Sequence, residues 1–198
     1  MQTAFVILAA YLLGSVPFAL ISSRLFGLAD PRSYGSGNPG ATNVLRSGNK
    51  KAALFTLLGD ALKGWVAVYV AQRMGLSDNI IGLVALAVFF GHLYPVFLKF
   101  RGGKGVATAA GVLIGLDPLL GLTVAGIWLF VALAFRYSSL AAILAAALAP
   151  VYSLLMHGAN SQIIVIGIIA MALIGKHWQN FQRLLAGQES KIGGKKKS

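Results

Sequence analysis

A short basic turn, Lys99-Phe-Arg-Gly-Gly-Lys-Gly-Val106, separates two apolar segments of the chain, residues 79–98 and 106–116. Glycines let backbone N–H groups approach an anion closely. If a helix begins at about Gly105, its free N–H groups and the positive end of its dipole face the same place. Lys104 adds a full charge on a flexible stem, so the turn predicts a phosphate site.

This turn is not a Walker A loop. Leu98 occupies the position of the first glycine of that motif, and Gly105 that of the Ser or Thr that holds magnesium. The same residues also fit a simpler interpretation, a basic turn at the membrane surface that binds no ligand. Basic residues collect on the cytoplasmic side of membrane proteins whether or not a ligand binds there, and glycines soften turns at the membrane surface.

Composition indicates an integral membrane protein. Of the 198 residues, 57% are hydrophobic and only 11% are charged, which is typical of membrane chains. The 17 Lys and Arg against five acids give a net charge of +12; positive-inside bias explains this excess, and anionic lipid or an anionic substrate would exploit it. Too little water-facing surface remains for nucleic acid, and with no Cys the chain has no disulfides or thiolate nucleophiles. The N-terminal segment is apolar and lacks a basic region before Arg24, so we expect a retained first span rather than a signal peptide.

The hydropathy pattern predicts an all-α polytopic membrane protein with seven transmembrane helices. The expected spans are residues 2–26, 52–71, 79–98, 106–116, 119–135, 139–156 and 161–175. The first span should bend near Pro17. We expect a single membrane domain, residues 1–198, with three polar segments: the glycine-rich loop 27–51, the turn 99–105 and the basic tail 176–198. The last six residues of that tail are of low complexity and are expected to be disordered.

The fourth span is short: twelve residues from Gly105 make about 18 Å of helix against a hydrocarbon core of about 30 Å. Charge placement nevertheless favours a crossing. With seven crossings, every Lys and Arg lies on one side except Lys63, inside a span, and Arg73. Without this crossing, Arg136 and the tail would move to the opposite face. The positive-inside rule therefore predicts an outside N-terminus and a cytoplasmic C-terminus, with all three polar segments in the cytoplasm. Local thinning, or a glycine turn sunken into a water-filled cavity, would assist the short helix.

Two of the polar segments carry groups suited to phosphate oxygens. The first contains Gly35-Ser-Gly-Asn-Pro-Gly-Ala-Thr-Asn43, whose hydroxyl and amide side chains are followed by the planar fork of Arg46. A turn-rich connector is the alternative, although connections of this length are often functional. In the tail, His177, Asn180 and Arg183 recur every three residues, so a continued helix would place them on one face. A solvated helix end remains the alternative there.

Several common catalytic schemes are missing from the sequence. No serine lies in a Gly-x-Ser-x-Gly elbow, and no histidine is followed by the Asp of the His-x4-Asp pattern. The five acids form no pair and no His-rich cluster, so neither a metal nor a cofactor is expected. Inside the predicted spans, Asp60 and Lys63 are spaced i, i+3, as a functional pair or a simple ion pair would be. His92 closes the third span, as a packed histidine or as a general base.

The polar motifs together resemble one family over essentially the whole chain. They are Gly35 to Asn43 with Arg46; Asp60-Ala-Leu-Lys-Gly64; Gly91-His-Leu-Tyr-Pro-Val-Phe97 running into Gly102-Gly-Lys-Gly-Val-Ala-Thr108; and His177 to Asn180 followed by Arg183-Leu-Leu-Ala-Gly-Gln-Glu189. The chain is similar to the acyl-phosphate-dependent glycerol-3-phosphate acyltransferases of bacteria, small polytopic membrane enzymes of the PlsY type. Gln188, where the family often has a small or basic residue, is a mild departure.

The resemblance implies transfer of a fatty acyl group from acyl phosphate to the 1-hydroxyl of sn-glycerol 3-phosphate, giving lysophosphatidic acid and phosphate. It implies a bacterial cytoplasmic (inner) membrane location, membrane lipid as the surroundings, and functional coupling to the enzyme that makes acyl phosphate. An activated acyl phosphate needs mainly positioning and charge neutralisation, so we expect a substrate phosphate oxygen, rather than a protein base, to take the hydroxyl proton. A membrane anion or phosphate transporter is the competing hypothesis, weakened by the absence of an internal repeat.

The matching positions then take roles in this reaction. The residues expected to carry catalysis are Lys104, Ser36, Arg46, Asn180 and His177. Those expected to bind substrate are Gly35, Gly37, Asn38, Thr42, Asn43, Gly102, Gly103, Gly105 and Arg183. Those expected to support the site are His92, Asp60, Lys63 and Glu189. In this scheme the backbone of the three glycines 102, 103 and 105 cradles the acyl phosphate together with Lys104. Ser36, Arg46 and Asn180 hold glycerol 3-phosphate.

Overall fold

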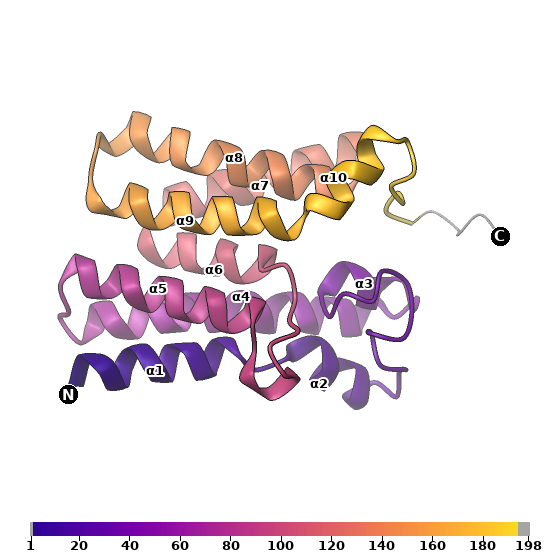
Figure 1. Cartoon of the computed structure of the whole chain (residues 1–198), viewed down its shortest axis with the longest axis horizontal. Helices are drawn as coiled ribbons and strands as arrows, with labels where there is room; N and C mark the ends of the chain where they lie inside the picture. Colours follow the sequence, from indigo (N-terminus) through magenta and orange to yellow (C-terminus); the bar gives the residue numbers. More distant parts are fainter. Residues whose placement is uncertain (1, 194–198) are drawn as a thin grey trace.

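The computed structural model describes residues 2–193, and all regular structure within them is helical (Figure 1). The helices are α1 (Gln2–Gly14), α2 (Phe18–Leu25), α3 (Ala41–Leu45), α4 (Lys50–Arg73), α5 (Asp78–Leu93), the 3₁₀ turn η1 (Val96–Leu98), α6 (Val106–Leu116), α7 (Pro118–Phe135), α8 (Ser138–His157), α9 (Ser161–Lys176) and α10 (Trp178–Leu185). The all-α prediction is confirmed for this part of the chain. The disorder expected at the end of the tail concerns residues outside it, apart from Gly193.

Each predicted span is helical in the structure, although span 2–26 is divided into α1 and α2 and span 79–98 into α5 and η1. Not every helix is long enough to cross a membrane by itself. Four meet the length and hydropathy required: α4, α5 with η1, α7 and α8. The pairs α1–α2 and α9–α10 meet it only when each bent pair is taken as one span, which gives up to six among residues 2–193. The 42° bend between α1 and α2 falls beside Pro17, as predicted. α6, with 11 residues, is too short to meet the same requirement.

Close backbone contacts hold the short helix α6 against α4. A Cβ on Gly111 would lie 1.9 Å from the Ala61 carbonyl oxygen, and one on Gly64 would lie 2.4 Å from that of Thr108. Only glycine permits such an approach, which membrane helices use in place of a hydrophobic driving force. Figure 1 shows α6 between the α4–α5 pair and the α8–α9 pair. The short helix is therefore largely packed by protein rather than by the surroundings.

The connections fall at two ends of the helix bundle (Figure 1). The α2–α3–α4 connection, the turn between η1 and α6, the α7–α8 turn and α10 lie toward the end where the chain finishes. The α4–α5, α6–α7 and α8–α9 turns lie toward the opposite end. All three polar segments predicted from the sequence are therefore gathered at one end.

The structure corrects the expectation of a helix continued into the tail. α9 ends at Lys176, and α10 begins at Trp178 after a bend of 57°. The polar segment 27–51 also contains a short helix, α3, and its last two residues already belong to α4. At the start of α4 the Asn49 side chain accepts from the Ala52 N–H, a local cap that hydropathy alone does not encode.

Candidate active site

Asn43 organises the first polar segment. Its side chain is 2% exposed; Nδ2 donates to the carbonyl oxygens of Pro31 (2.6 Å) and Tyr34 (3.2 Å), and Oδ1 accepts from the Ser36 N–H (2.9 Å). A Cβ on Gly35 would lie 2.2 Å from Oδ1, and this glycine has φ of 61°. Asn43 thus shapes the turn that presents Ser36, and it is itself buried away from any ligand.

The rest of this segment is tied to the far end of the chain. Thr42 Oγ1 lies 3.1 Å from Ser138 Oγ at the start of α8. Arg46 donates from Nη2 to Ser190 Oγ at 2.6 Å. Gly37, like Gly35, has a positive φ, and the Asn38 N–H donates weakly to Ser36 Oγ at 3.4 Å. Ser36 and Arg46 are both exposed in this segment.

A single carboxylate, that of Glu189, gathers the polar groups of the tail. Oε1 accepts from Ser139 Oγ at 2.8 Å and from Asn180 Nδ2 at 2.7 Å, while Oε2 accepts from Arg183 Nε at 2.7 Å. Burial alone would raise the pKa of Glu189, but these hydrogen bonds lower it below its usual range. Asn180 is 6% exposed, and its Oδ1 accepts from the ammonium of Lys104. A continuous network therefore joins the glycine turn to the tail.

We call Arg46, Lys104 and Arg183 the cationic cluster. Burial lowers the pKa of Lys104 to about 8; the charge of Glu189 opposes this, and the charges of Arg183 and Arg46 add to it. Lys104 is therefore repelled by the charges of Arg46 and Arg183 and attracted by the carboxylate of Glu189. Such an excess of positive charge in a half-buried position is suited to phosphate groups.

The backbone of the glycine turn differs from the expectation. The N–H of Gly102 donates to the Leu93 carbonyl (3.3 Å) and that of Gly103 to the His92 carbonyl (3.2 Å), so both are committed to α5 rather than free for an anion. Gly105, with φ of 85°, is the N-cap of α6, and no side chain caps this end. The helix start predicted at about Gly105 is confirmed, and the donors left for an anion are those of the first turn of α6.

His177 lies at the bend between α9 and α10 and is 4% exposed. Its Nδ1 is 2.8 Å from the Leu173 carbonyl oxygen. Because a carbonyl only accepts, Nδ1 carries the hydrogen and Nε2 is the remaining ring nitrogen. The side chain therefore helps to fix the bend that brings Asn180 toward Lys104.

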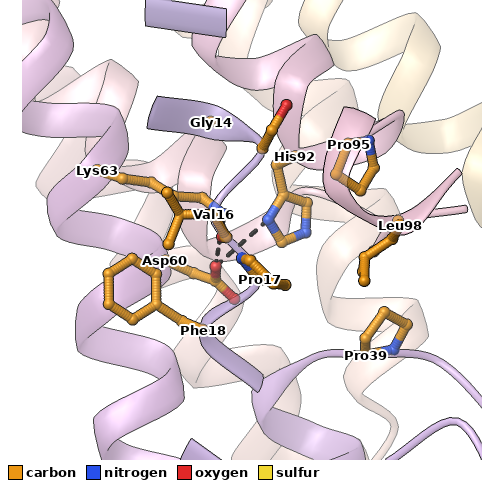
Figure 2. A pocket seen from close by; sticks show the side chains of 13 residues that line it. Gly14, Val16, Pro17, Phe18, Pro39, Asp60, Lys63, His92, Pro95 and Leu98 are labelled. Carbon is orange, nitrogen blue, oxygen red and sulfur yellow. Dashed lines mark hydrogen bonds and ion pairs between the residues drawn. The ribbon is translucent and has the colours of Figure 1, made fainter. Parts of the chain in front are cut away.

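Asp60, Lys63 and His92 form a buried group beside the α1–α2 break (Figure 2). Asp60 Oδ1 lies 2.8 Å from Lys63 Nζ and 3.4 Å from His92 Nδ1. Lys63 also donates to the carbonyl of Val16 at 2.8 Å. A cavity of about 10 Å³ adjoins this group and reaches Gly102 and the neighbouring glycine of the turn, which is room for about one water.

A larger cavity of about 380 Å³ lies around Asp117 and His157 at the end opposite the polar segments, and none of the predicted site residues lines it.

Within residues 2–193, no group of three or more His, Asp or Glu side chains could hold a metal. The sequence analysis missed three serines that complete the network, namely Ser138, Ser139 and Ser190. Nothing local marks them, because their partners lie between 50 and 144 residues away.

Comparison with known proteins identifies the family. The family model for glycerol-3-phosphate acyltransferase matches residues 4–187. A glycerol-3-phosphate acyltransferase of Dechloromonas aromatica (strain RCB) is 80% identical over 198 residues, covering all of both chains. One of Cupriavidus taiwanensis is 60% identical over 194 residues, covering 96% of each chain.

Solved structures give the same answer. The glycerol 3-phosphate form of PlsY (YgiH), an integral membrane glycerol 3-phosphate acyltransferase, superposes with a TM-score of 0.92 at 37% identity, covering 98% of this chain and 96% of that one. Its lysophosphatidic acid form superposes with a TM-score of 0.89 at 36% identity, covering 96% and 95%. The transporter hypothesis is therefore set aside in favour of an enzyme. Because these similarities span all three polar segments, the chain belongs to the glycerol-3-phosphate acyltransferase family, as its motifs predicted.

Proposed function

We propose that this enzyme transfers a fatty acyl group from acyl phosphate to the 1-hydroxyl of sn-glycerol 3-phosphate. The observation that carries the proposal is the cationic cluster of Arg46, Lys104 and Arg183. Asn180 and Glu189 join Lys104 to Arg183, and Arg46 bonds to Ser190, the residue after Glu189. Both substrates would present a phosphate group, and the cluster supplies cations without a catalytic metal or a serine nucleophile. The glycerol 3-phosphate form of the related PlsY supports the acceptor.

The residues take the following roles in this proposal. Lys104 and the first turn of α6, which begins after Gly105, neutralise the acyl phosphate. Ser36, Arg46 and Asn180 hold the phosphate of glycerol 3-phosphate, and Lys104 bridges the two. The residues that shape these positions are Gly35, Gly37, Asn38, Thr42, Asn43, His177, Arg183 and Glu189. The acyl chain leaves sideways between helices toward lipid.

The chemistry is a displacement at the acyl carbon. The 1-hydroxyl oxygen bonds to the acyl carbon, the bond from that carbon to the phosphate oxygen breaks, and inorganic phosphate leaves. A phosphate oxygen of the substrates takes the hydroxyl proton, so no protein base is needed. Because the donor is already activated, positioning and charge neutralisation supply most of the acceleration.

We also infer the arrangement in the membrane. α1, α4, α5, α6, α7, α8 and α9 make seven crossings, with the N-terminus outside and the C-terminus in the cytoplasm of a bacterium. The gathering of the basic polar segments at one end of the bundle supports this through the positive-inside rule. Close packing of α6 against α4 lets a short helix cross where the bilayer thins. The active site then faces the cytoplasm, where the enzyme that makes acyl phosphate can supply it.

The donor is tested with purified protein in lipid, supplied with glycerol 3-phosphate and no added metal. Palmitoyl phosphate and palmitoyl-CoA are offered in parallel reactions. The proposal expects lysophosphatidic acid from palmitoyl phosphate alone. Product from palmitoyl-CoA alone would contradict the proposed donor while leaving the family assignment in place.

A further inference from the structure

The buried group of Asp60, Lys63 and His92 fastens three separate parts of the chain to one another. Asp60 and Lys63 belong to α4, and Lys63 donates to the Val16 carbonyl at the α1–α2 break. His92 is the second-to-last residue of α5 and lies 3.4 Å from Asp60 through Nδ1. Asp60, Lys63 and His92 are each at most 8% exposed. Charged groups at such depth are expensive, so this arrangement calls for a function beyond packing.

The opposite edge of the His92 ring faces the glycine turn. A Cβ on Gly103 would lie 2.2 Å from His92 Nε2, and its three nearest atoms would all belong to that ring. The N–H of Gly103 also donates to the His92 carbonyl at 3.2 Å. His92 therefore contacts this glycine through both its side chain and its backbone. Lys104, the next residue, reaches Asn180 and the cationic cluster.

We propose that His92 is a positioning residue for acyl transfer, whose ring is oriented by Asp60 and Lys63 and in turn sets the place of Gly103 and Lys104. The proposal rests on the proposed role of Lys104. In Figure 2 the His92 ring points toward Asp60 with one nitrogen, and Lys63 reaches the same carboxylate from the other side. Lys63 thus holds the Asp60 carboxylate in place, and this carboxylate holds the His92 ring in one orientation. The position of the glycine turn depends on the position of the ring.

A general base is the rival role for the same histidine, because a carboxylate beside one ring nitrogen is also how bases are oriented. The structure favours positioning. Nε2 lies where a Cβ on Gly103 would be, and the adjoining cavity has room for about one water. A cavity of this size does not admit glycerol 3-phosphate to that nitrogen.

A double-mutant cycle tests the proposal, with kcat/KM for glycerol 3-phosphate as the readout. His92→Ala and Gly103→Ala should each lower it by roughly 10²-fold, the scale of a misplacement of about 1 Å. The pair combined should be no worse than His92→Ala alone, because removing the ring removes everything that the new Cβ meets. A multiplicative loss in the double variant would overturn the proposal.

Gly102→Ala is the matched control. Its Cβ would lie 2.1 Å from the His92 carbonyl oxygen and 2.4 Å from Pro95 Cδ, and neither atom is removed by His92→Ala. The two losses should therefore be non-additive at position 103, whereas at position 102 the loss of the double variant should be the product of the two single losses. Non-additive losses at both positions would indicate general loosening of the turn and would overturn the specific contact.

Two further measurements separate positioning from the other roles. Asp60→Asn keeps the side-chain size while removing the charge, and it should lower kcat/KM without changing the shape of the pH profile. If a limb of the profile with a histidine-like pKa disappears in His92→Ala, the residue is a general base and the proposal is wrong.

If wild type makes no product from palmitoyl phosphate, the proposed donor fails instead. The cycle is then measured as glycerol 3-phosphate affinity by titration calorimetry, with gel filtration to check that each variant is folded.

Discussion

Asn180 donates from Nδ2 to Oε1 of Glu189 at 2.7 Å, while its Oδ1 accepts from Lys104. One amide therefore joins the Glu189 carboxylate to the lysine of the glycine turn, because it donates through its nitrogen and accepts through its oxygen. Glu189 also accepts from Ser139 and Arg183. The same carboxylate therefore fixes the tail and partly neutralises the positive charge of the cationic cluster. Several expected outcomes follow from this arrangement.

The pH dependence of substrate capture should report on Lys104. Its pKa in the free enzyme is lowered to about 8, chiefly by burial, so the lysine loses its charge as the pH rises through that value. Because kcat/KM reports ionisations of the free enzyme, kcat/KM for glycerol 3-phosphate should fall above about pH 8. Lys104→Arg stays charged throughout and should remove this alkaline limb, whatever its effect on the rate itself. An unchanged limb in the arginine variant would assign the ionisation to another group.

Glu189 should stabilise the fold in a pH-dependent way. Hydrogen bonds to the carboxylate outweigh the effect of burial and hold its pKa below the ordinary 4.5. Its contribution is therefore fully present above that ordinary value and is lost as the pH falls through the lower folded-state pKa. Glu189→Gln should destabilise the protein at pH 7 by about 1.5–3 kcal/mol, the range for hydrogen bonds to a charged group.

Thermal unfolding in detergent at pH 7 and pH 3 checks this prediction. The gap between wild type and Glu189→Gln should narrow at the lower pH. Ser139→Ala, which removes one donor but leaves the charged carboxylate with its other two donors, is the matched control and should cost about 1.5 kcal/mol at pH 7, the low end of the same range. A gap that stays the same at both pH values would show that the charge of Glu189 does not matter.

Asn43→Ala should raise KM for glycerol 3-phosphate by about tenfold, with a smaller effect on kcat at saturation. The change leaves the Ser36 N–H and the Pro31 carbonyl without their partner, which costs about 1–3 kcal/mol when such groups are buried. The turn that presents Ser36 would loosen as a result. Steady-state kinetics decide the matter: an unchanged KM would mean that the turn keeps its shape without this amide.

Whether α6 crosses the membrane can be read from cysteine labelling, because the chain has no Cys of its own. Arg101 precedes α6 and Leu119 follows it, and both are exposed. In intact spheroplasts, a membrane-impermeant maleimide should label Leu119→Cys but should reach Arg101→Cys only after permeabilisation. Equal labelling of the two in intact cells would place them on one side and reduce the crossings by one.

The sequence predicted the membrane-span helices well because each is an apolar run bounded by polar residues, whereas the short helix α3 was not predicted. The ends of α6, α7 and α8 lie within one residue of the predicted spans, and the α1–α2 break falls at Pro17. The bend at His177 was missed because α10 is turned by its contacts with Lys104 and Glu189. Hydrogen bonds that span 76 residues from Lys104 or 50 from Ser139 leave no periodic trace in the sequence.

The motifs named the candidate site residues, and their roles toward a ligand stay predictions. The structure shows which of these residues are buried among other protein groups. Asn43 is buried among backbone groups, and the N–H groups of Gly102 and Gly103 are already bonded to α5. Such roles depend on which of several possible hydrogen-bond partners is near, and only the tertiary fold settles that.

The central claim is that the cationic cluster carries out acyl transfer, and Lys104→Ala tests it most directly. Lysophosphatidic acid and inorganic phosphate are measured together from palmitoyl phosphate and glycerol 3-phosphate, with Arg101→Ala, an exposed cation of the same turn, as the control. Both wild type and the Arg101→Ala control should release one inorganic phosphate for each lysophosphatidic acid formed. Lys104→Ala, still folded, should turn over roughly 10²-fold more slowly, the scale for losing one charge-stabilising donor. Near-normal turnover in Lys104→Ala would contradict the account.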